Sequence, residues 1–156
     1  MQIKVSKRDI LTPDLAARLK RARSPRAALE AMGLTVVSLA QRAFTSPSLR
    51  PQAWAPLKPA TLKRKAAKGY GSKPLIAEGV LAQSPRIVTV TDRTVTVGSD
   101  RRVGSHSLAA IHQLGSTDGR VPARPFFPFD KNGRPTDRAK RNILAAARRA
   151  LALERR

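Results

Sequence analysis

Residues 86–98, RIVTVTDRTVTVG, limit the possible folds more than any other stretch, because valine and threonine alternate on both sides of a central Asp-Arg pair. A two-residue turn at that pair places Val90 opposite Val95. The same register places Val88 opposite Val97, so that one face is all valine and the other all threonine. We therefore predict an antiparallel hairpin whose valine face is buried in the core. Because Asp-Arg lacks the glycine usual in tight hairpin turns, a longer loop or a shifted register is the alternative.

A long amphipathic helix is the second predicted element, and it would cover the hairpin. Between residues 26 and 44, apolar side chains recur at steps of three and four, which marks one face of a helix. These apolar residues are Leu29, Met32, Val36, Ala40 and Phe44. Gly33 lies inside the pattern and would allow a close helix contact.

Shorter elements complete an α+β fold in one domain, residues 1–156. We predict a short strand over 2–5, helices over 12–22, 59–68, 105–114 and 136–154, and one or two helical turns over 75–83. Two segments rich in proline and glycine, 45–58 and 116–135, are predicted loops. The predicted fold is a small antiparallel sheet packed against a long helix, with a basic helix at the C-terminal end. That last helix has a narrow apolar stripe, formed by Ala139, Ile143, Ala146, Ala150 and Leu153.

The core that these elements can form is thin. Alanine accounts for 24 of the 156 residues, whereas leucine, isoleucine, valine and phenylalanine together number 36. That share is close to the level at which highly charged chains become disordered. The formal net charge is +21 and is spread along the whole chain. We therefore expect partner surfaces, polyanions or self-assembly to add stability.

Several classes of protein are excluded by composition. The chain has no cysteine, which rules out disulfides, thiolate metal sites and cysteine catalysis. No apolar run approaches the length of a transmembrane helix, and the first residues lack the apolar segment of a secretory signal. We expect a protein made in a cytoplasm, or carried in a particle assembled there, with no membrane contact.

No catalytic constellation is visible in the sequence. The ten acidic residues are scattered, and no pair has a spacing that suggests acid–base catalysis. His106 and His112 are six residues apart, which does not place them on one helical face as a zinc helix requires. We expect no enzyme activity, metal or cofactor, and we interpret His112 as a packed or hydrogen-bonded residue.

Nucleic-acid binding is the alternative that the charge supports, because phosphate neutralisation needs only clustered lysine and arginine. One candidate cluster is Lys63, Arg64 and Lys65, and the other is the arginine-rich final helix with Arg138, Arg141, Arg148 and Arg149. No zinc finger, RNA-binding aromatic motif or basic zipper accompanies them. This alternative is therefore a basic protein that binds nucleic acid without sequence preference.

The order of short motifs resembles a known family. WAPL at 54–57 is followed by LIAEGVL at 75–81, the hairpin, AAIHQLG at 109–115 and VPARPFF at 121–127. This order and spacing is similar to the phage virion morphogenesis family of Mu-like phages, the tail-completion or head–tail joining proteins. The sequence departs from the family pattern at Glu78, where serine or threonine usually precedes the glycine.

The resemblance implies a small α+β structural protein of the virion neck. Such proteins form a ring, commonly six-fold, between the head connector and the tail tube. The partners implied are other copies of the chain, adjacent neck and tail-tube proteins, and packaged DNA. The resemblance does not separate a tail terminator from a stopper or a joining protein.

The matched motifs supply structural and interface candidates, which are Trp54, Leu57, Gly79, His112, Gly115, Arg124, Phe126 and Phe127. The Trp54-to-Leu57 segment would cap the core beneath the long helix, or else lie exposed at an interface. The two glycines would serve backbone turns.

Arg124 lies between two prolines and could reach a carboxylate or carbonyl of a neighbour. Phe126 and Phe127 would anchor a contact with another protein or, alternatively, complete the core of the monomer. We expect the arginines of the final helix to face a neighbouring protein or the DNA path. The alternative is a solvated outer face whose charge aids solubility.

Overall fold

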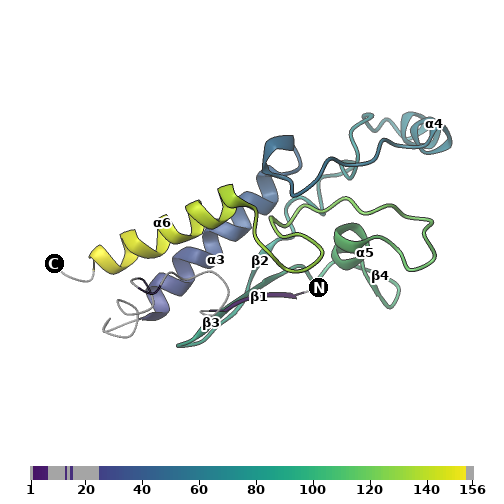
Figure 1. Cartoon of the computed structure of the whole chain (residues 1–156). Coiled ribbons are helices and arrows are strands. Elements are labelled where there is room, and N and C mark those ends of the chain that lie inside the picture. The colour runs from purple at the N-terminus through teal and green to yellow at the C-terminus, as the bar shows by residue number, and fades with distance from the viewer. Residues whose placement is uncertain (1, 7–12, 14, 16–24, 154–156) are drawn as a thin grey trace.

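The computed structural model describes residues 2–6, 13, 15 and 25–153 (Figure 1). In chain order the elements are β1 (Gln2–Ser6), α3 (Pro25–Arg42), the 3₁₀ turn η1 (Pro47–Leu49), α4 (Pro59–Ala67), β2 (Arg86–Val90), β3 (Thr94–Gly98), β4 (Arg102–Val103), β5 (His106–Ser107), α5 (Leu108–Leu114) and α6 (Asp137–Leu153). These elements confirm the predicted α+β fold. The helix predicted over 12–22 lies almost entirely outside the described residues.

Strand β3 is the centre of a three-stranded antiparallel sheet with the order β1-β3-β2. The hairpin of β2 and β3 is confirmed, and Val90 pairs with Val95 as predicted. The predicted pairing of Val88 with Val97 is wrong, because the register shifts and Ile87 pairs with Val97 instead. The irregularity leaves the Val88 side chain 41% exposed and packs Ile87 against the core. A β-bulge has this effect, since one extra residue moves the following side chains to the other face.

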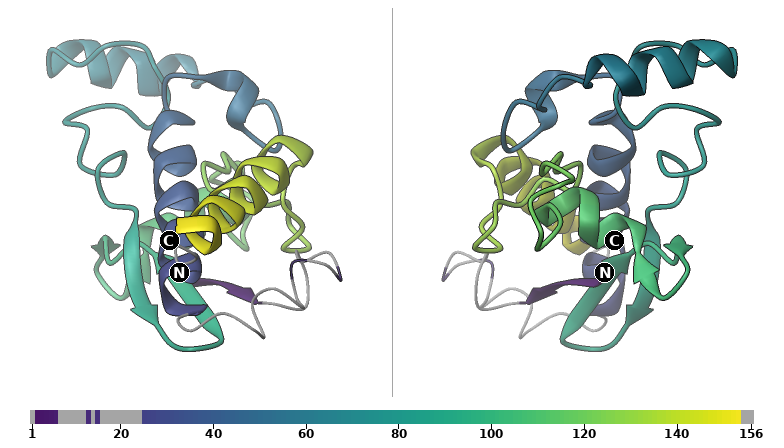
Figure 2. Two further views of the ribbon diagram at one scale, coloured as in Figure 1. Left: turned by 90° about the vertical axis from the view of Figure 1, so that its left-hand side faces the viewer. Right: turned by 90° about the vertical axis from the view of Figure 1, so that its right-hand side faces the viewer.

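Helix α3 lies between this sheet and α6 (Figures 1 and 2). Its predicted apolar face is buried, with Leu29, Met32, Val36, Ala40 and the following Phe44 all among the core residues. Gly33 faces the sheet, and a Cβ atom added there would lie 2.6 Å from Val95 Cγ2 and 3.0 Å from Ile87 Cδ1. The glycine therefore permits a close contact of this helix, and the element that it contacts is the sheet.

Helix α6 packs along α3 and forms the outer layer (Figure 1). The Thr136 side chain begins it by accepting a hydrogen bond from the Ala139 N–H at 3.2 Å. The buried face is wider than the predicted stripe and contains Ala139, Ile143, Leu144, Ala146, Ala147 and Leu151. Within the described residues, no helix has both the length and the apolar character needed to cross a bilayer.

A buried glutamine makes four hydrogen bonds to the extended segment 121–129. Gln113 Oε1 accepts hydrogen bonds from the N–H groups of Phe126 (3.1 Å) and Phe127 (3.0 Å). Its Nε2 donates to the carbonyl oxygens of Phe127 (3.3 Å) and Phe129 (3.0 Å). Phe126 and Phe127 are fully buried, so they complete the core of this chain, which is the second of the two roles considered for them.

Candidate functional site

Residues 57–80 form an arm that projects from the body of the protein (Figure 1). Helix α4 lies in this arm, away from α3, α6 and the sheet, and none of its residues is buried (Figures 1 and 2). The predicted basic helix over 59–68, ended by Gly69 with φ +72°, is confirmed. A helix of nine residues with no buried face gains little from packing within its own chain.

The outgoing root of the arm is fixed to segment 121–129 by three hydrogen bonds. Trp54 Nε1 donates to the Pro125 carbonyl at 2.8 Å. The Arg124 guanidinium donates to the carbonyl oxygens of Ala55 at 2.9 Å and Pro56 at 3.1 Å. Arg124 is only 6% exposed, so the neighbour that it reaches is its own chain. Burial lowers the pKa of Arg124 from its ordinary value, although an arginine stays protonated in proteins.

Trp54 is half-buried and packs at the edge of the core. Its ring meets Phe44 in a T-shaped contact with centroids 5.7 Å apart, and the Arg50 guanidinium lies 3.7 Å above the indole centroid. Arg50 also donates to the carbonyls of Ala43 and Phe44 at the end of α3. Trp54 therefore caps the core at the end of α3, which is one of the two roles that were considered for it.

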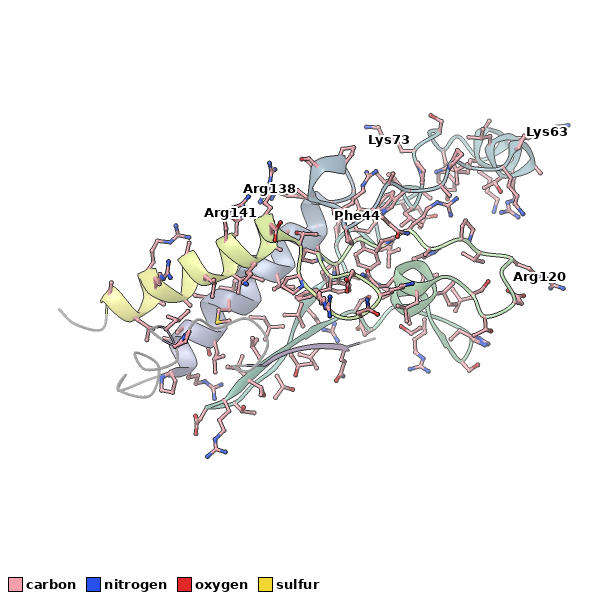
Figure 3. All side chains as sticks on the ribbon, viewed as in Figure 1. Phe44, Lys63, Lys73, Arg120, Arg138 and Arg141 are labelled. Atoms are coloured by element: carbon pink, nitrogen blue, oxygen red, sulfur yellow. The ribbon has the colours of Figure 1, made fainter. Side chains whose placement is uncertain are left out.

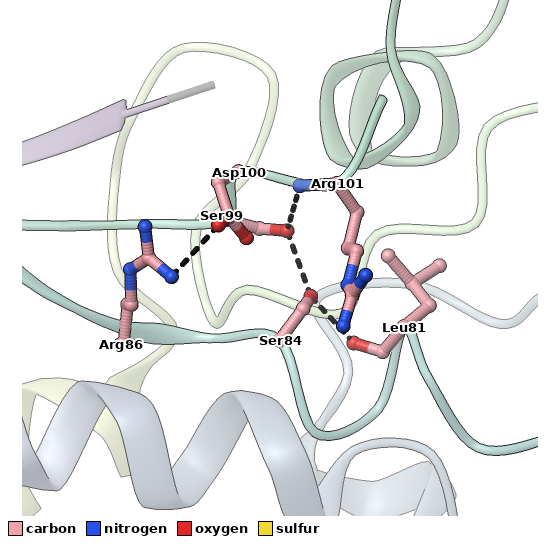
Figure 4. A network of polar contacts seen from close by, with 6 residues as sticks. All are labelled: Leu81, Ser84, Arg86, Ser99, Asp100 and Arg101. Carbon is pink, nitrogen blue, oxygen red and sulfur yellow. Dashed lines mark hydrogen bonds and ion pairs between the residues drawn. The ribbon is translucent and has the colours of Figure 1, made fainter. Parts of the chain in front are cut away.

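The returning root of the arm is fixed to the sheet by two buried serines (Figure 4). The Ser99 hydroxyl donates to Ser84 Oγ at 2.7 Å, and the Ser84 hydroxyl donates to the Leu81 carbonyl at 2.8 Å. Ser99 Oγ accepts from the Arg101 N–H at 3.3 Å. This chain of bonds holds residues 81–84 at the open end of the β2–β3 hairpin.

Inside the arm, a lysine closes the loop that follows α4. Lys65 Nζ donates to the carbonyls of Lys73 (2.7 Å) and Ile76, and the Tyr70 hydroxyl donates to a Glu78 carboxylate oxygen. The predicted helical turns over 75–83 reduce to a single turn, in which the Gln83 N–H donates to the Gly79 carbonyl at 3.1 Å. Positive φ angles at Leu75 (60°) and Gly79 (76°) interrupt the helix.

Between the arm and the body lies a groove of about 810 Å³. Its apolar lining includes Leu57, Ile76, Val80 and Leu108, and its charged lining consists of Lys58, Arg64, Lys65, Arg120, Arg124 and one acid, Glu78. Figure 3 shows Lys63 and Lys73 on the arm, with Arg120 at the tip of the loop below it. Five cations and one carboxylate, which already accepts from Tyr70, give the groove a positive field.

The groove brings together six of the predicted site residues, namely Leu57, Arg64, Lys65, Gly79, His112 and Arg124. The structure does not place Trp54, Gly115, Phe126 or Phe127 in the lining of the groove. Gly115 ends α5 with φ +87°, and a Cβ atom there would lie 3.3 Å from the Val121 carbonyl oxygen. The four predicted arginines of α6 lie outside the groove, and Lys63 is on α4 but does not line it.

His112 lines the groove and lies in an environment that shifts its pKa. Its Nδ1 atom is buried and has no hydrogen-bond partner, so of the two roles considered for His112, packed or hydrogen-bonded, the structure supports the packed one. Burial lowers the pKa of the imidazole, and the nearby Arg124 charge lowers it further. The described residues contain no group of three or more side chains of the types that bind metal ions.

Two groove residues, Val80 and Arg120, were not among the predicted site residues, although Val80 lies within the LIAEGVL motif at 75–81. Val80 is 41% exposed on the arm, and Arg120 is ion-paired with Asp118 at 3.3 Å in the loop before segment 121–129. Neither residue lies in a regular helix or strand of the structure. Their shared location becomes visible only when the arm is placed opposite the loop.

Together these features define a small, strongly basic α+β protein with a hollow between a projecting arm and the body. The model of the phage virion morphogenesis family matches residues 9–152, and the chain belongs to this family. Membership places it among the proteins that build phage particles. The chain has no significant match among curated proteins or among solved structures.

Proposed function

We propose that this protein is a structural component of the neck of a tailed phage, where it completes the tail or joins it to the head. It acts as a six-fold ring between the head connector and the tail tube. The family membership supports a role in building the virion. The observation that carries the finer proposal is the arm, which projects from the body beside the groove and has no buried residue in α4.

A groove of this kind is suited to a partner protein. Leu57, Ile76 and Val80 offer apolar surface for a side-chain anchor, and the surrounding cations set the charge of what can bind. A second copy of this chain is a poor occupant, because it has 31 basic and 10 acidic residues. The proposed occupant is an acidic segment of an adjacent neck or tail protein.

The test compares two valines of equal exposure. Val80 lines the groove and Val88 lies on the bulge of β2, and both side chains are 41% exposed. Each is replaced by aspartate in a phage whose own copy is inactivated, and infectious particles are counted. Val80→Asp should lower the yield at least about tenfold, because a carboxylate there repels an acidic partner. Val88→Asp should give a near-normal yield.

Electron microscopy of the Val80→Asp lysate should then show separate heads and tails. Density for the protein at the head–tail junction of normal virions would support its place in the neck. Equal yields from the two variants would contradict the groove as a joining surface. Absence of the protein from the junction would contradict the neck function itself.

A further inference from the structure

A second hollow lies at the corner where the chain leaves α3 and where α6 begins. It has a volume of about 440 Å³ and is lined by Arg42, Ser46, Ser48, Arg138, Arg141 and Asn142, together with a leucine. We call it the arginine pocket. It shares no lining residue with the groove beneath the arm. Figure 3 shows Arg138 and Arg141 on the same side of α6, beside this corner.

The three arginines of the pocket have no acidic partner among the described residues. Arg26, Arg86 and Arg120 are ion-paired with Glu30, Asp100 and Asp118, but no such pair involves an arginine of the pocket. Arg138 Nη1 donates to Ser48 Oγ at 3.4 Å. Three exposed guanidinium groups held around one hollow repel each other, and an anion between them would relieve that repulsion.

Positive charge continues from the arginine pocket along one face of α6. Arg138 and Arg141 are three residues apart, so they lie on one face of the helix. Arg148 is seven residues further on and returns to that face, and with a rise of 1.5 Å per residue the three span about 15 Å. The pocket is therefore one end of a row of arginines along the exposed side of α6.

We propose that the arginine pocket binds the sugar–phosphate backbone of nucleic acid. Arginine, serine and asparagine side chains are the groups that contact phosphate and sugar in protein–DNA complexes. The lining is almost wholly polar, which suits such a backbone. It offers no apolar anchor of the kind found at the centre of protein–protein interfaces. The assignment goes beyond the neck proposal, since it concerns a separate surface and would hold if the groove had no partner.

The test separates the pocket from the general charge of the chain. The variant Arg42→Gln/Arg138→Gln/Arg141→Gln is compared with Arg93→Gln/Arg101→Gln/Arg102→Gln, whose three arginines are also exposed but lie outside the pocket. Both variants lose three positive charges, so the nonspecific electrostatic attraction to DNA weakens equally in the two. Binding of a short duplex DNA is measured by fluorescence anisotropy over a series of salt concentrations.

The pocket variant should bind DNA at least about tenfold more weakly than the control variant at moderate salt. The slope of log K against log salt should be smaller in magnitude by about two to three, because each of the three lost phosphate contacts contributes about 0.9 to that slope. Equal losses in the two variants would overturn the proposal. So would a larger loss of binding to poly-glutamate than to DNA, since an acidic protein surface would then be the better ligand.

A second variant keeps all three arginines and guards against an effect on folding. Ser48→Glu places a carboxylate at the exposed edge of the pocket, where it can pair with Arg138 and compete with phosphate. Thr45→Glu is the matched control, because Thr45 is exposed nearby but does not line the pocket. Ser48→Glu should lose several-fold more DNA affinity than Thr45→Glu, and equal affinities would count against the assignment.

Discussion

The side chain of Gln113 and the backbone of Phe127 are joined by two reciprocal hydrogen bonds. The Phe127 N–H donates to Oε1 at 3.0 Å, and Nε2 donates to the Phe127 carbonyl at 3.3 Å. One side-chain amide thus does what a neighbouring strand would do for the same residue. Segment 121–129 needs such a partner, because its prolines leave few backbone donors for a sheet.

Replacing Gln113 with alanine should lower the free energy of unfolding by about 3 kcal/mol or more, because it leaves several buried groups unpaired. Gln113→Glu should also lower the free energy of unfolding, since an ionised carboxylate cannot donate to the carbonyls of Phe127 and Phe129. Urea denaturation followed by circular dichroism measures the change, with the exposed Gln52→Ala as the control. A Gln113→Ala protein as stable as that control would contradict this role.

Gly33→Ala should destabilise the fold by about 1–3 kcal/mol, because the added methyl group would press on the sheet. The nearest atom, Val95 Cγ2, would be only 2.6 Å away. Gly71→Ala is the matched control, since a Cβ atom there meets nothing within 4 Å. Thermal unfolding of both variants gives the comparison, and equal midpoints would show that the sheet can move to accept the methyl group.

The bulge in β2 predicts opposite outcomes for two valines that simple alternation would pair. Val97 is fully buried, so Val97→Asp should cost roughly 3 kcal/mol or more by placing an unpaired charge in the core. Val88→Asp should change the free energy of unfolding by less than about 1 kcal/mol, because that side chain is exposed on the bulge. Similar losses in both variants would instead support the unbulged register.

The lowered pKa of His112 predicts that stability falls in mild acid. Above its ordinary pKa of 6.5, the imidazole is neutral in both the folded and the unfolded chain. As the pH falls below that value the unfolded chain takes up the proton first, and stability is lost until the lower pKa of the folded state is passed. The slope from one such group cannot exceed about 1.4 kcal/mol per pH unit.

His112→Asn should therefore flatten the decline in stability between about pH 7 and pH 5. Urea midpoints measured across this range test the expectation, with the same replacement at the exposed His106 for comparison. An unchanged pH profile in the His112 variant would show that its burial does not affect the folding equilibrium.

Sequence patterns were sufficient to place the main elements of the fold. The Val/Thr alternation located the β2–β3 hairpin, and helical periodicity located α3 and α6 to within a few residues. The bulge could not be predicted, because Ile87 and Val88 are equally apolar and the choice between them depends on the surface of α3. The sequence of residues 75–83 has a helical pattern. In the structure, however, positive φ angles at Leu75 and Gly79, together with the hydrogen bond from the Lys65 ammonium to the Ile76 carbonyl, hold the segment in turns.

The site was predictable only in part. The matched motifs indicated residues that do meet in the groove, such as Leu57, His112 and Arg124. Their roles were harder to predict, because Arg124 finds its partners at Ala55 and Pro56, more than 60 positions earlier in the chain. Arg42 was not predicted as a member of the arginine pocket, since it lies 96 residues before Arg138 and belongs to a helix recognised for its apolar face.

The two roots of the arm determine how it would respond to mechanical load. A force on α4 that is transmitted through the preceding segment reaches the body through the hydrogen bonds of Trp54 and Arg124. These bonds all join residues 54–56 to residues 124–125. A force that is transmitted through the segment after α4 reaches the body through the hydrogen bond between Ser84 and Ser99. Bonds that cross one junction side by side share the force and break together. The arm is therefore anchored to the body at both of its ends, so a load on α4 is divided between two junctions.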